Sequence, residues 1–150
     1  MLPFLVDMDR LFELFVVEWL KQHAPAQYAI VEQENVTFSM RDVEDVEVKI
    51  NIDITVKDLE TGRTAFVLDT KYKAAERPAA ADIQQVVAYA AAKDCTKAAL
   101  VYPVKLGRPV SVMWGSDIYV RSLDYRLDGD LEDAGRNLLE QPHNWSASGA

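Results

Sequence analysis

The sequence predicts a single α/β domain in which helices flank a mixed β-sheet. Three observations support this: a helical period near the N-terminus, two stretches with the period of a strand around a turn, and an alanine-rich helix followed by a buried strand. The chain has 150 residues, the length of one ordinary domain. We expect residues 1–140 to form this domain and residues 141–150, rich in small and polar side chains, to form a flexible tail.

The first predicted element is a helix that follows Asp7, a suitable N-cap, and ends before Pro25. Its apolar side chains recur at the spacing of one helical face: Met8, Leu11, Phe12, Phe15, Val16, Trp19 and Leu20. Glu13 lies at the flank of this stripe, where a carboxylate could reach a site beside the sheet. Taken alone, Glu13 is more typical of a surface side chain.

Extended segments are predicted next. Two short ones cover Tyr28–Glu32 and Val36–Met40. In Val46–Val56 every even position is apolar, which predicts a strand with one polar face. The turn Asp58–Arg63 separates it from a second strand, Thr64–Lys73.

The second half of the chain alternates helices and strands. Pro78 opens a predicted helix over Ala79–Lys93, and a buried strand follows at Ala98–Tyr102. The remaining predicted elements are two strands and a helix, at Val110–Trp114, Ile118–Leu123 and Leu131–Leu139.

Composition and charge limit the possible functions. One cysteine, Cys95, excludes a disulfide framework, and with His23 and His143 it offers no zinc site. No apolar run approaches the roughly 20 residues that span a bilayer, and no signal peptide is recognisable, so we expect a cytoplasmic protein. The formal net charge of −8 means that DNA binding would need positive charge from a partner.

The predicted hairpin brings two carboxylates together. If its turn centres on Thr61, residues equally far on either side are partners, which pairs Asp53 with Asp69. Lys71 projects from the same face as Asp69. Adjacent carboxylates repel unless a proton or cation lies between them, and Mg²⁺ prefers such oxygen ligands. The alternative interpretation is an ordinary solvated strand face.

The second predicted helix adds a polar face. Asp82, Gln85 and Tyr89 share this face, which lies away from the apolar stripe of the helix. By itself the pattern is more typical of a solvent-exposed surface.

Motifs in these elements resemble a known nuclease family. FVLDTKYK, preceded by NIDITV, is similar to the core of PD-(D/E)xK nucleases, with Ile52 in place of the usual proline. Gln85 and Tyr89 in DIQQVVAYA resemble the Q-x-x-x-Y element of RecB-like members. Together with MDRLFELFVVEWL and ALVYP, these motifs look most like McrC-like proteins, the nuclease subunits of methylcytosine-specific restriction systems, over Leu2–Pro103.

The resemblance implies a restriction-endonuclease-like three-layer α/β (α+β) fold with core order αβββαβ, and a Mg²⁺-dependent DNA endonuclease in which Mn²⁺ can replace Mg²⁺. The metal ligands that it implies are Asp53, Asp69, the main-chain carbonyl of Thr70, and Glu13. Lys71 would position or deprotonate the attacking water and stabilise charge on the phosphate. Gln85 and Tyr89 would orient Lys71 or the DNA backbone, and Lys73 would bind substrate beside them.

The resemblance also implies partners. They are DNA and a McrB-like AAA+ GTPase motor subunit, which would hold the DNA because the chain offers few cations near the site: Lys71, Lys73 and Arg77. McrC-like proteins normally carry an N-terminal part that contacts the motor. This chain begins almost at the first predicted helix, which fits either a stand-alone nuclease domain or a fragment.

Two other functions remain open. A non-catalytic interaction subunit on the same fold is favoured by the net charge, although every residue needed for catalysis is present. A RecB-like DNA-repair nuclease is the second alternative, and its cluster-bearing version is excluded because Cys95 alone cannot ligate an iron–sulfur cluster.

Overall fold

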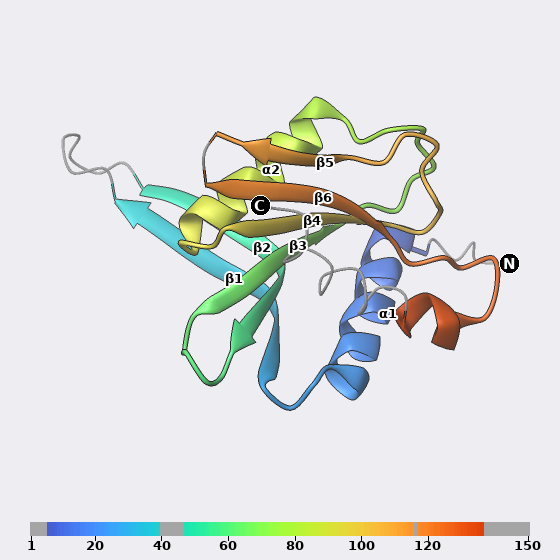
Figure 1. The fold of residues 1–150 in the computed structure, drawn as a ribbon, viewed down its shortest axis with the longest axis horizontal. Coiled ribbons are helices and arrows are strands. Elements are labelled where there is room, and N and C mark those ends of the chain that lie inside the picture. Colours follow the sequence, from blue (N-terminus) through green and yellow to red (C-terminus); the bar gives the residue numbers. More distant parts are fainter. Residues whose placement is uncertain (1–5, 40–46, 116, 137–150) are drawn as a thin grey trace, which may run out of the picture.

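A computed structural model describes residues 6–39, 47–115 and 117–136 of the chain (Figure 1). The elements are α1 (Met8–His23), β1 (Tyr28–Ser39), β2 (Glu47–Asp58), β3 (Thr64–Thr70), α2 (Ala80–Ala92), β4 (Lys97–Tyr102), β5 (Ser111–Trp114) and β6 (Ile118–Asp124). The first six follow the predicted αβββαβ order, and the mixed sheet with its flanking helices is a restriction-endonuclease-like fold. No helix among the described residues is long and apolar enough to cross a membrane.

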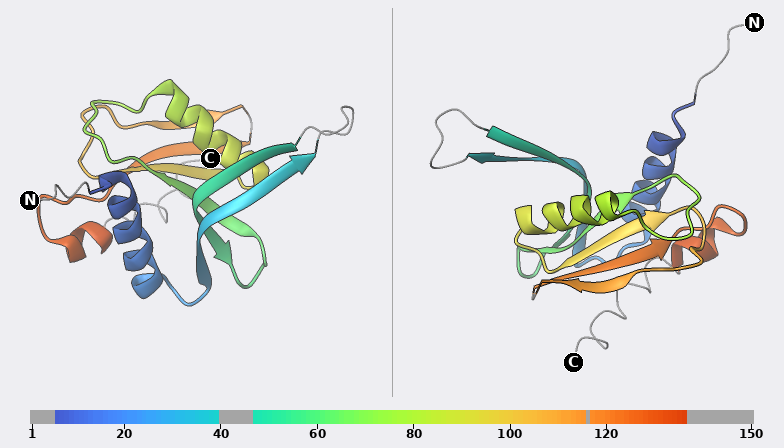
Figure 2. Two further views of the ribbon diagram at one scale, coloured as in Figure 1. Left: turned by 180° about the vertical axis from the view of Figure 1, so that it is seen from behind. Right: turned by 90° about the horizontal axis from the view of Figure 1, so that it is seen from above.

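Within the described residues the strands form one six-stranded sheet in the order β1-β2-β3-β4-β6-β5. The pairs β1–β2, β2–β3 and β5–β6 are antiparallel, while β3–β4 and β4–β6 are parallel. A parallel pair needs a crossover connection, and α2 provides it between β3 and β4. Figure 2 shows α2 lying across the sheet and the β1–β2 hairpin projecting beyond it.

The two helices bury different parts of the sheet, which makes three layers. Phe12 and Val16 of α1 pack in one apolar cluster with Leu68 of β3. Val86 and Ala90 of α2 belong to a second cluster with other sheet residues. The carboxyl end of β3 therefore lies between two helices.

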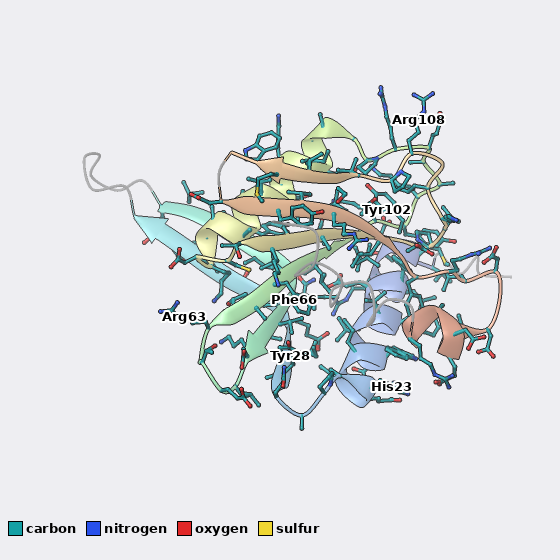
Figure 3. All side chains as sticks on the ribbon, viewed as in Figure 1. His23, Tyr28, Arg63, Phe66, Tyr102 and Arg108 are labelled. Atoms are coloured by element: carbon teal, nitrogen blue, oxygen red, sulfur yellow. The ribbon has the colours of Figure 1, made fainter. Side chains whose placement is uncertain are left out.

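The β2–β3 register is the one predicted from a turn centred on Thr61. Ile54 pairs with Leu68 and Val56 with Phe66, and a bulge follows after Val56. The ring of Phe66 packs edge-on against Tyr28 of β1, with their centroids 6.0 Å apart (Figure 3). This packing ties the three antiparallel strands together.

The single polar face predicted for β2 is wrong. Thr55 is fully buried, and Ile52 packs with the α2 cluster whereas Ile54 packs with the α1 cluster. Helices cover both faces of the central strands, so these strands bury residues on both faces. The strand passes from the α2 cluster to the α1 cluster at Asp53, which lies opposite Gln33 of β1. The backbone of Gln33 has a positive φ of 50°.

Strand β1 is continuous, which corrects the two short segments predicted at Tyr28–Glu32 and Val36–Met40. Residues on both sides of Gln33 pair with β2 in one register. The unusual backbone at Gln33 interrupts the apolar pattern without ending the pairing. Met40 lies outside the described residues.

Two smaller differences concern the end of one strand and the face of one helix. Strand β3 ends at Thr70, before the predicted Lys73, because the Lys73 N–H donates to the Lys71 carbonyl (3.0 Å) in a tight turn. Phe15, predicted in the apolar stripe of α1, is 46% exposed. Residues 131–136 are helical, in agreement with the start of the predicted last helix; its remaining residues and the predicted tail at 141–150 lie outside the described residues.

Candidate functional site

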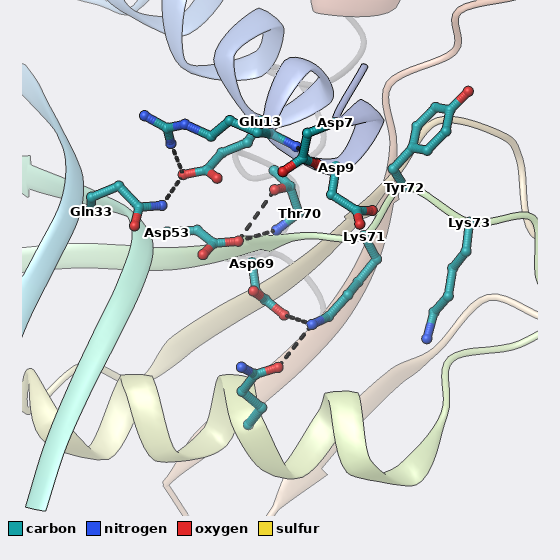
Figure 4. Close-up of a pocket in the computed structure, with 12 residues that line it drawn as sticks. Asp7, Asp9, Glu13, Gln33, Asp53, Asp69, Thr70, Lys71, Tyr72 and Lys73 are labelled. Carbon is teal, nitrogen blue, oxygen red and sulfur yellow. Dashed lines mark hydrogen bonds and ion pairs between the residues drawn. The ribbon is translucent and has the colours of Figure 1, made fainter. Parts of the chain in front are cut away.

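A cavity of about 510 Å³ opens where β2 and β3 part, between α1 and α2 (Figure 4). The last paired residues of this ladder are Ile54 and Leu68, so Asp53 and Asp69 follow directly at its end. The cavity is lined by seven of the residues predicted from the sequence: Glu13, Asp53, Asp69, Thr70, Lys71, Lys73 and Gln85. The eighth, Tyr89, does not line it but supports Gln85 from behind.

Asp53 and Asp69 form a close carboxyl pair. Asp53 Oδ2 accepts hydrogen bonds from the Thr70 backbone N–H (3.1 Å) and hydroxyl (3.2 Å). Asp69 is only 1% exposed. Its burial, followed by hydrogen bonding with Asp53 and the negative charge of Asp53, raises the pKa of Asp69 to about 8. This corner therefore favours a proton or a metal cation between the two groups.

Lys71 is the nearest cation to this pair. Its Nζ lies 2.9 Å from Asp69 Oδ2 and 3.7 Å from Asp82 Oδ1, and it donates a hydrogen bond to Gln85 Oε1 (2.8 Å). Buried Asp69 Oδ2 thus has the Lys71 ammonium as its partner, and no other donor contacts it among the described residues. Burial acts to lower the pKa of Lys71, but the neighbouring carboxylates, led by Asp69, raise it above its ordinary value.

The polar face of α2 borders the site, where Gln85 lines the open cavity. Gln85 accepts from Lys71 through its oxygen and donates through Nε2 to Tyr89 Oη (2.8 Å). Lys73 donates to Asp82 on the first turn of the same helix. Burial, and then the charges of Asp69 and Asp53, raise the pKa of Tyr89, which stays a neutral phenol. The helix thus fixes the direction of Lys71.

Glu13 reaches the cavity from α1 but turns toward other partners. It is 7% exposed, and its Oε1 accepts from Gln33 Nε2 and lies 3.1 Å from Arg10 Nη1. Burial, together with the charge of Asp53, raises the pKa of Glu13, against the opposing effect of its two donors. The Asn51 amide donates to Gln33 Oε1 (2.8 Å), which orients the Gln33 amide so that its N–H faces Glu13.

Sequence reasoning missed Gln33 and Asn51. Gln33 fell in a predicted gap between strands, and only the continuous pairing of β1 with β2 brings it opposite Asp53. Asn51 was visible two residues before Asp53, but its partner was not. Arg77, expected beside the site, does not line the cavity, whereas Arg10 does.

The cavity carries more negative than positive charge. Its lining includes five carboxylates, Asp7, Asp9, Glu13, Asp53 and Asp69, against three cations, Arg10, Lys71 and Lys73. One of the five, Asp7, also caps α1 by accepting from the Arg10 backbone N–H (3.1 Å). Such a cavity attracts cations and repels phosphate unless a cation enters first.

The metal ligands predicted from the sequence are brought together only in part. Within the described residues, no group of three or more His, Cys, Asp or Glu side chains is gathered as a metal site. Asp53 and Asp69 supply two adjacent carboxylates, with the Thr70 backbone beside them. Glu13 lies near Asp53, but one of its oxygens is engaged by Gln33 and Arg10.

The αβββαβ core, with two aspartates and a lysine at the end of its second and third strands, defines a restriction-endonuclease-like domain. A family model for the McrBC 5-methylcytosine restriction system component matches residues 1–103. The chain therefore belongs to this family of restriction-system components.

Comparison with solved structures supports the fold. The chain is similar to a chain of a half-complex of Thermococcus gammatolerans McrB AAA+ hexamers with bound McrC, with a TM-score of 0.72 and 18% sequence identity. The match covers 95% of this chain and 34% of that chain, so this chain spans about a third of its relative's length. No match is found among curated proteins.

Substitution of Gln33 tests its left-handed backbone. Gln33→Gly and Gln33→Ala remove the same amide, but a Cβ is strained at a φ of 50° and glycine is not. We expect the glycine variant to be more stable than the alanine variant by about 1 kcal/mol in urea unfolding. At the exposed strand residue Asn35 the order should reverse. If Gln33→Ala were at least as stable as Gln33→Gly, the positive φ assigned to position 33 would be contradicted.

Proposed function

We propose that this chain is a Mg²⁺-dependent DNA endonuclease that hydrolyses phosphodiester bonds. The single observation that carries the proposal is the cavity in which Asp53, Asp69 and Lys71 meet at the end of the β2–β3 ladder. Membership of a restriction-system family supports it, because DNA cleavage is the chemistry that such systems need.

The residues of this corner fit a hard divalent cation. Among the described residues the Lys71 ammonium is the only donor beside buried Asp69 Oδ2, and a second carboxyl group lies next to this aspartate. Mg²⁺ is commonly bound by one or two carboxylates and keeps several waters, so three protein carboxylates are not required. Asp53, Asp69 and the Thr70 carbonyl would hold it, with Glu13 as a further ligand, and Mn²⁺ would substitute. When bound, the metal polarises the phosphoryl oxygen and lowers the pKa of a bound water.

The side chains around this corner would supply the remaining functions. The Lys71 ammonium would stabilise charge on the phosphate and hold the attacking water, since it stands beside Asp69 at the open cavity. Gln85, itself held by Tyr89, would keep Lys71 in this position. Lys73 would bind the DNA backbone next to the cleaved bond.

Substitution of Asp69 and Lys71 tests the activity. The wild type should nick plasmid DNA with Mg²⁺ or Mn²⁺, and Asp69→Ala or Lys71→Ala should lower the rate by about 10²-fold or more, as expected for the loss of a charged group at the reacting phosphate. Lys105→Ala, an exposed lysine outside the cavity, is the control and should keep the wild-type rate. Circular dichroism should confirm that all variants fold. Cleavage by both cavity variants at the wild-type rate would contradict the proposed roles.

The pH dependence of metal binding tests the carboxyl pair. Because the pKa of Asp69 is raised to about 8, a proton competes with the metal below that pH. The increase in melting temperature on adding Mg²⁺ should therefore grow between pH 6 and pH 8.5, roughly around this pKa. The double variant Asp53→Ala/Asp69→Ala should show no increase at any pH. An unchanged Mg²⁺ effect in that variant would place the metal elsewhere.

We further propose that a separate nucleoside-triphosphate-driven motor of the McrB type presents DNA to this site. The net charge of −8 and the excess of carboxylates in the cavity both disfavour DNA binding by the chain alone. The similar solved structure comes from an assembly in which McrB hexamers hold McrC, which supports a partner of this kind.

A salt series of DNA binding and cleavage tests the need for a motor. The purified chain should bind duplex DNA poorly near 150 mM salt, roughly physiological ionic strength, and cleave it slowly. Addition of the motor and its nucleotide should restore cleavage. Tight binding and efficient cleavage by the chain alone at this salt would show that no partner is required, whereas absence of cleavage under every condition would favour an interaction subunit.

A further inference from the structure

A second cavity adjoins the proposed catalytic site. It measures about 390 Å³ and shares Tyr72 and Lys73 with the first cavity. The rest of its lining is mostly apolar: Ala74, Pro103, Val104 and Leu127, with Asp128. Tyr72 therefore stands between a cavity rich in carboxylates and one suited to an apolar group.

The direction of Tyr72 is fixed by its backbone and by the core. The hydrogen bond from the Lys73 N–H to the Lys71 carbonyl closes a tight turn with Tyr72 at its centre. The Tyr72 ring packs against Phe12, with their centroids 5.9 Å apart and tilted by 49°. Phe12 is buried, whereas Tyr72 is 37% exposed. In Figure 4 the Tyr72 ring points away from the carboxylate pair.

The second cavity lacks the negative charge of the first. The side chain of Asp128 is paired with Arg126 through two hydrogen bonds, of 3.1 and 3.0 Å, so its charge is compensated. The other charged group in the lining is the cation Lys73. A neutral, planar ring with polar edges suits this lining better than a phosphate or a metal ion does.

We propose that this cavity is a nucleobase subsite, in which the base of a nucleotide next to the cleaved phosphodiester stacks on Tyr72. The proposal rests on the proposed endonuclease function. Lys71 and Tyr72 are consecutive, so a phosphate beside Lys71 has its own nucleoside within reach of the Tyr72 ring. A base can reach this cavity only when it leaves the helical stack, so the cut would be made at an unpaired or flipped nucleotide.

The subsite is tested by removing the bases from the DNA strand and, separately, the ring of Tyr72 from the protein. Binding of single-stranded oligothymidylate and of an abasic strand of equal length is measured at low ionic strength, with Ca²⁺ in place of Mg²⁺ so that hydrolysis does not interfere. The wild type and Tyr72→Phe should prefer the strand with bases by about tenfold or more, since stacking one base on an aromatic ring contributes roughly 1–3 kcal/mol. Tyr72→Ala should lose this preference and keep the same affinity for the abasic strand.

Two further variants serve as controls, one that fills the cavity without changing Tyr72 and one that lies outside both cavities. Ala74→Leu fills the cavity from an exposed position with a side chain that offers no aromatic ring, and it should also remove the preference. Trp114→Ala removes an exposed aromatic ring on the edge strand β5, outside both cavities, and should change nothing. Preference for bases that persists in both Tyr72→Ala and Ala74→Leu, or that is absent from the wild type, would overturn the subsite.

A cleavage assay separates this proposal from the proposed function. Asp69→Asn should bind with the full preference for bases while losing cleavage, because Asp69 does not line the second cavity. A Tyr72-dependent preference without cleavage by the wild type or any variant, with or without the motor and its nucleotide, would support the subsite and contradict the endonuclease. Cleavage by the wild type without a Tyr72-dependent preference would overturn the subsite alone.

Discussion

The proposed site depends on the repulsion between two carboxyl groups at one corner, of which Asp69 is buried and Asp53 is partly buried. Asp53 and Asp69 meet at the end of the β2–β3 ladder, where Asp69 is almost fully enclosed and Lys71 is the only donor beside its Oδ2 among the described residues. Ionising both groups at such a place costs free energy unless a cation lies close. Lys71 compensates part of this charge through its ion pair, but the surrounding carboxylates still outnumber the cations. This excess of carboxylates supports the proposed metal site.

The fold forms this corner where the β2–β3 pairing ends, in the space between helices α1 and α2. Thr70 holds Asp53 with two hydrogen bonds, so the position of that carboxylate follows from the backbone of the neighbouring strand. Helix α2 holds Lys71 through Gln85, and α1 brings Glu13 to the opposite side. The apolar clusters beneath both helices keep the helices in place and exclude water from the far side of the pair. Loss of either helix would leave the aspartates adjacent but solvated.

Much of this arrangement could be predicted because it is local. The meeting of Asp53 and Asp69 just beyond the paired residues followed from the centre of a short turn, and the face shared by Gln85 and Tyr89 followed from helical spacing. The position of Gln33 could not be predicted, since it depends on the pairing of a strand whose apolar pattern is interrupted. The burial of Thr55 was also missed, because alternation along one strand does not reveal that helices cover both faces of the sheet.

The second cavity could not be predicted from sequence patterns for a similar reason. Its walls come from Tyr72, from Pro103 after β4, and from Leu127 after β6, segments that only the parallel order of the sheet brings together. These residues carry no shared motif. Sequence motifs therefore indicated the chemistry of the site, whereas the surface that would bind the substrate required the tertiary structure.

The central claim is that the Asp53–Asp69 corner holds a divalent metal. Crystals of the protein grown with Mn²⁺ and measured for anomalous scattering test it directly, because the metal gives its own signal independent of any activity. The account predicts a peak within roughly 2.0–2.4 Å of carboxylate oxygens of both aspartates, the range of Mg²⁺-like oxygen ligation. A peak elsewhere on the protein, or an empty corner at saturating Mn²⁺ and alkaline pH, would contradict it.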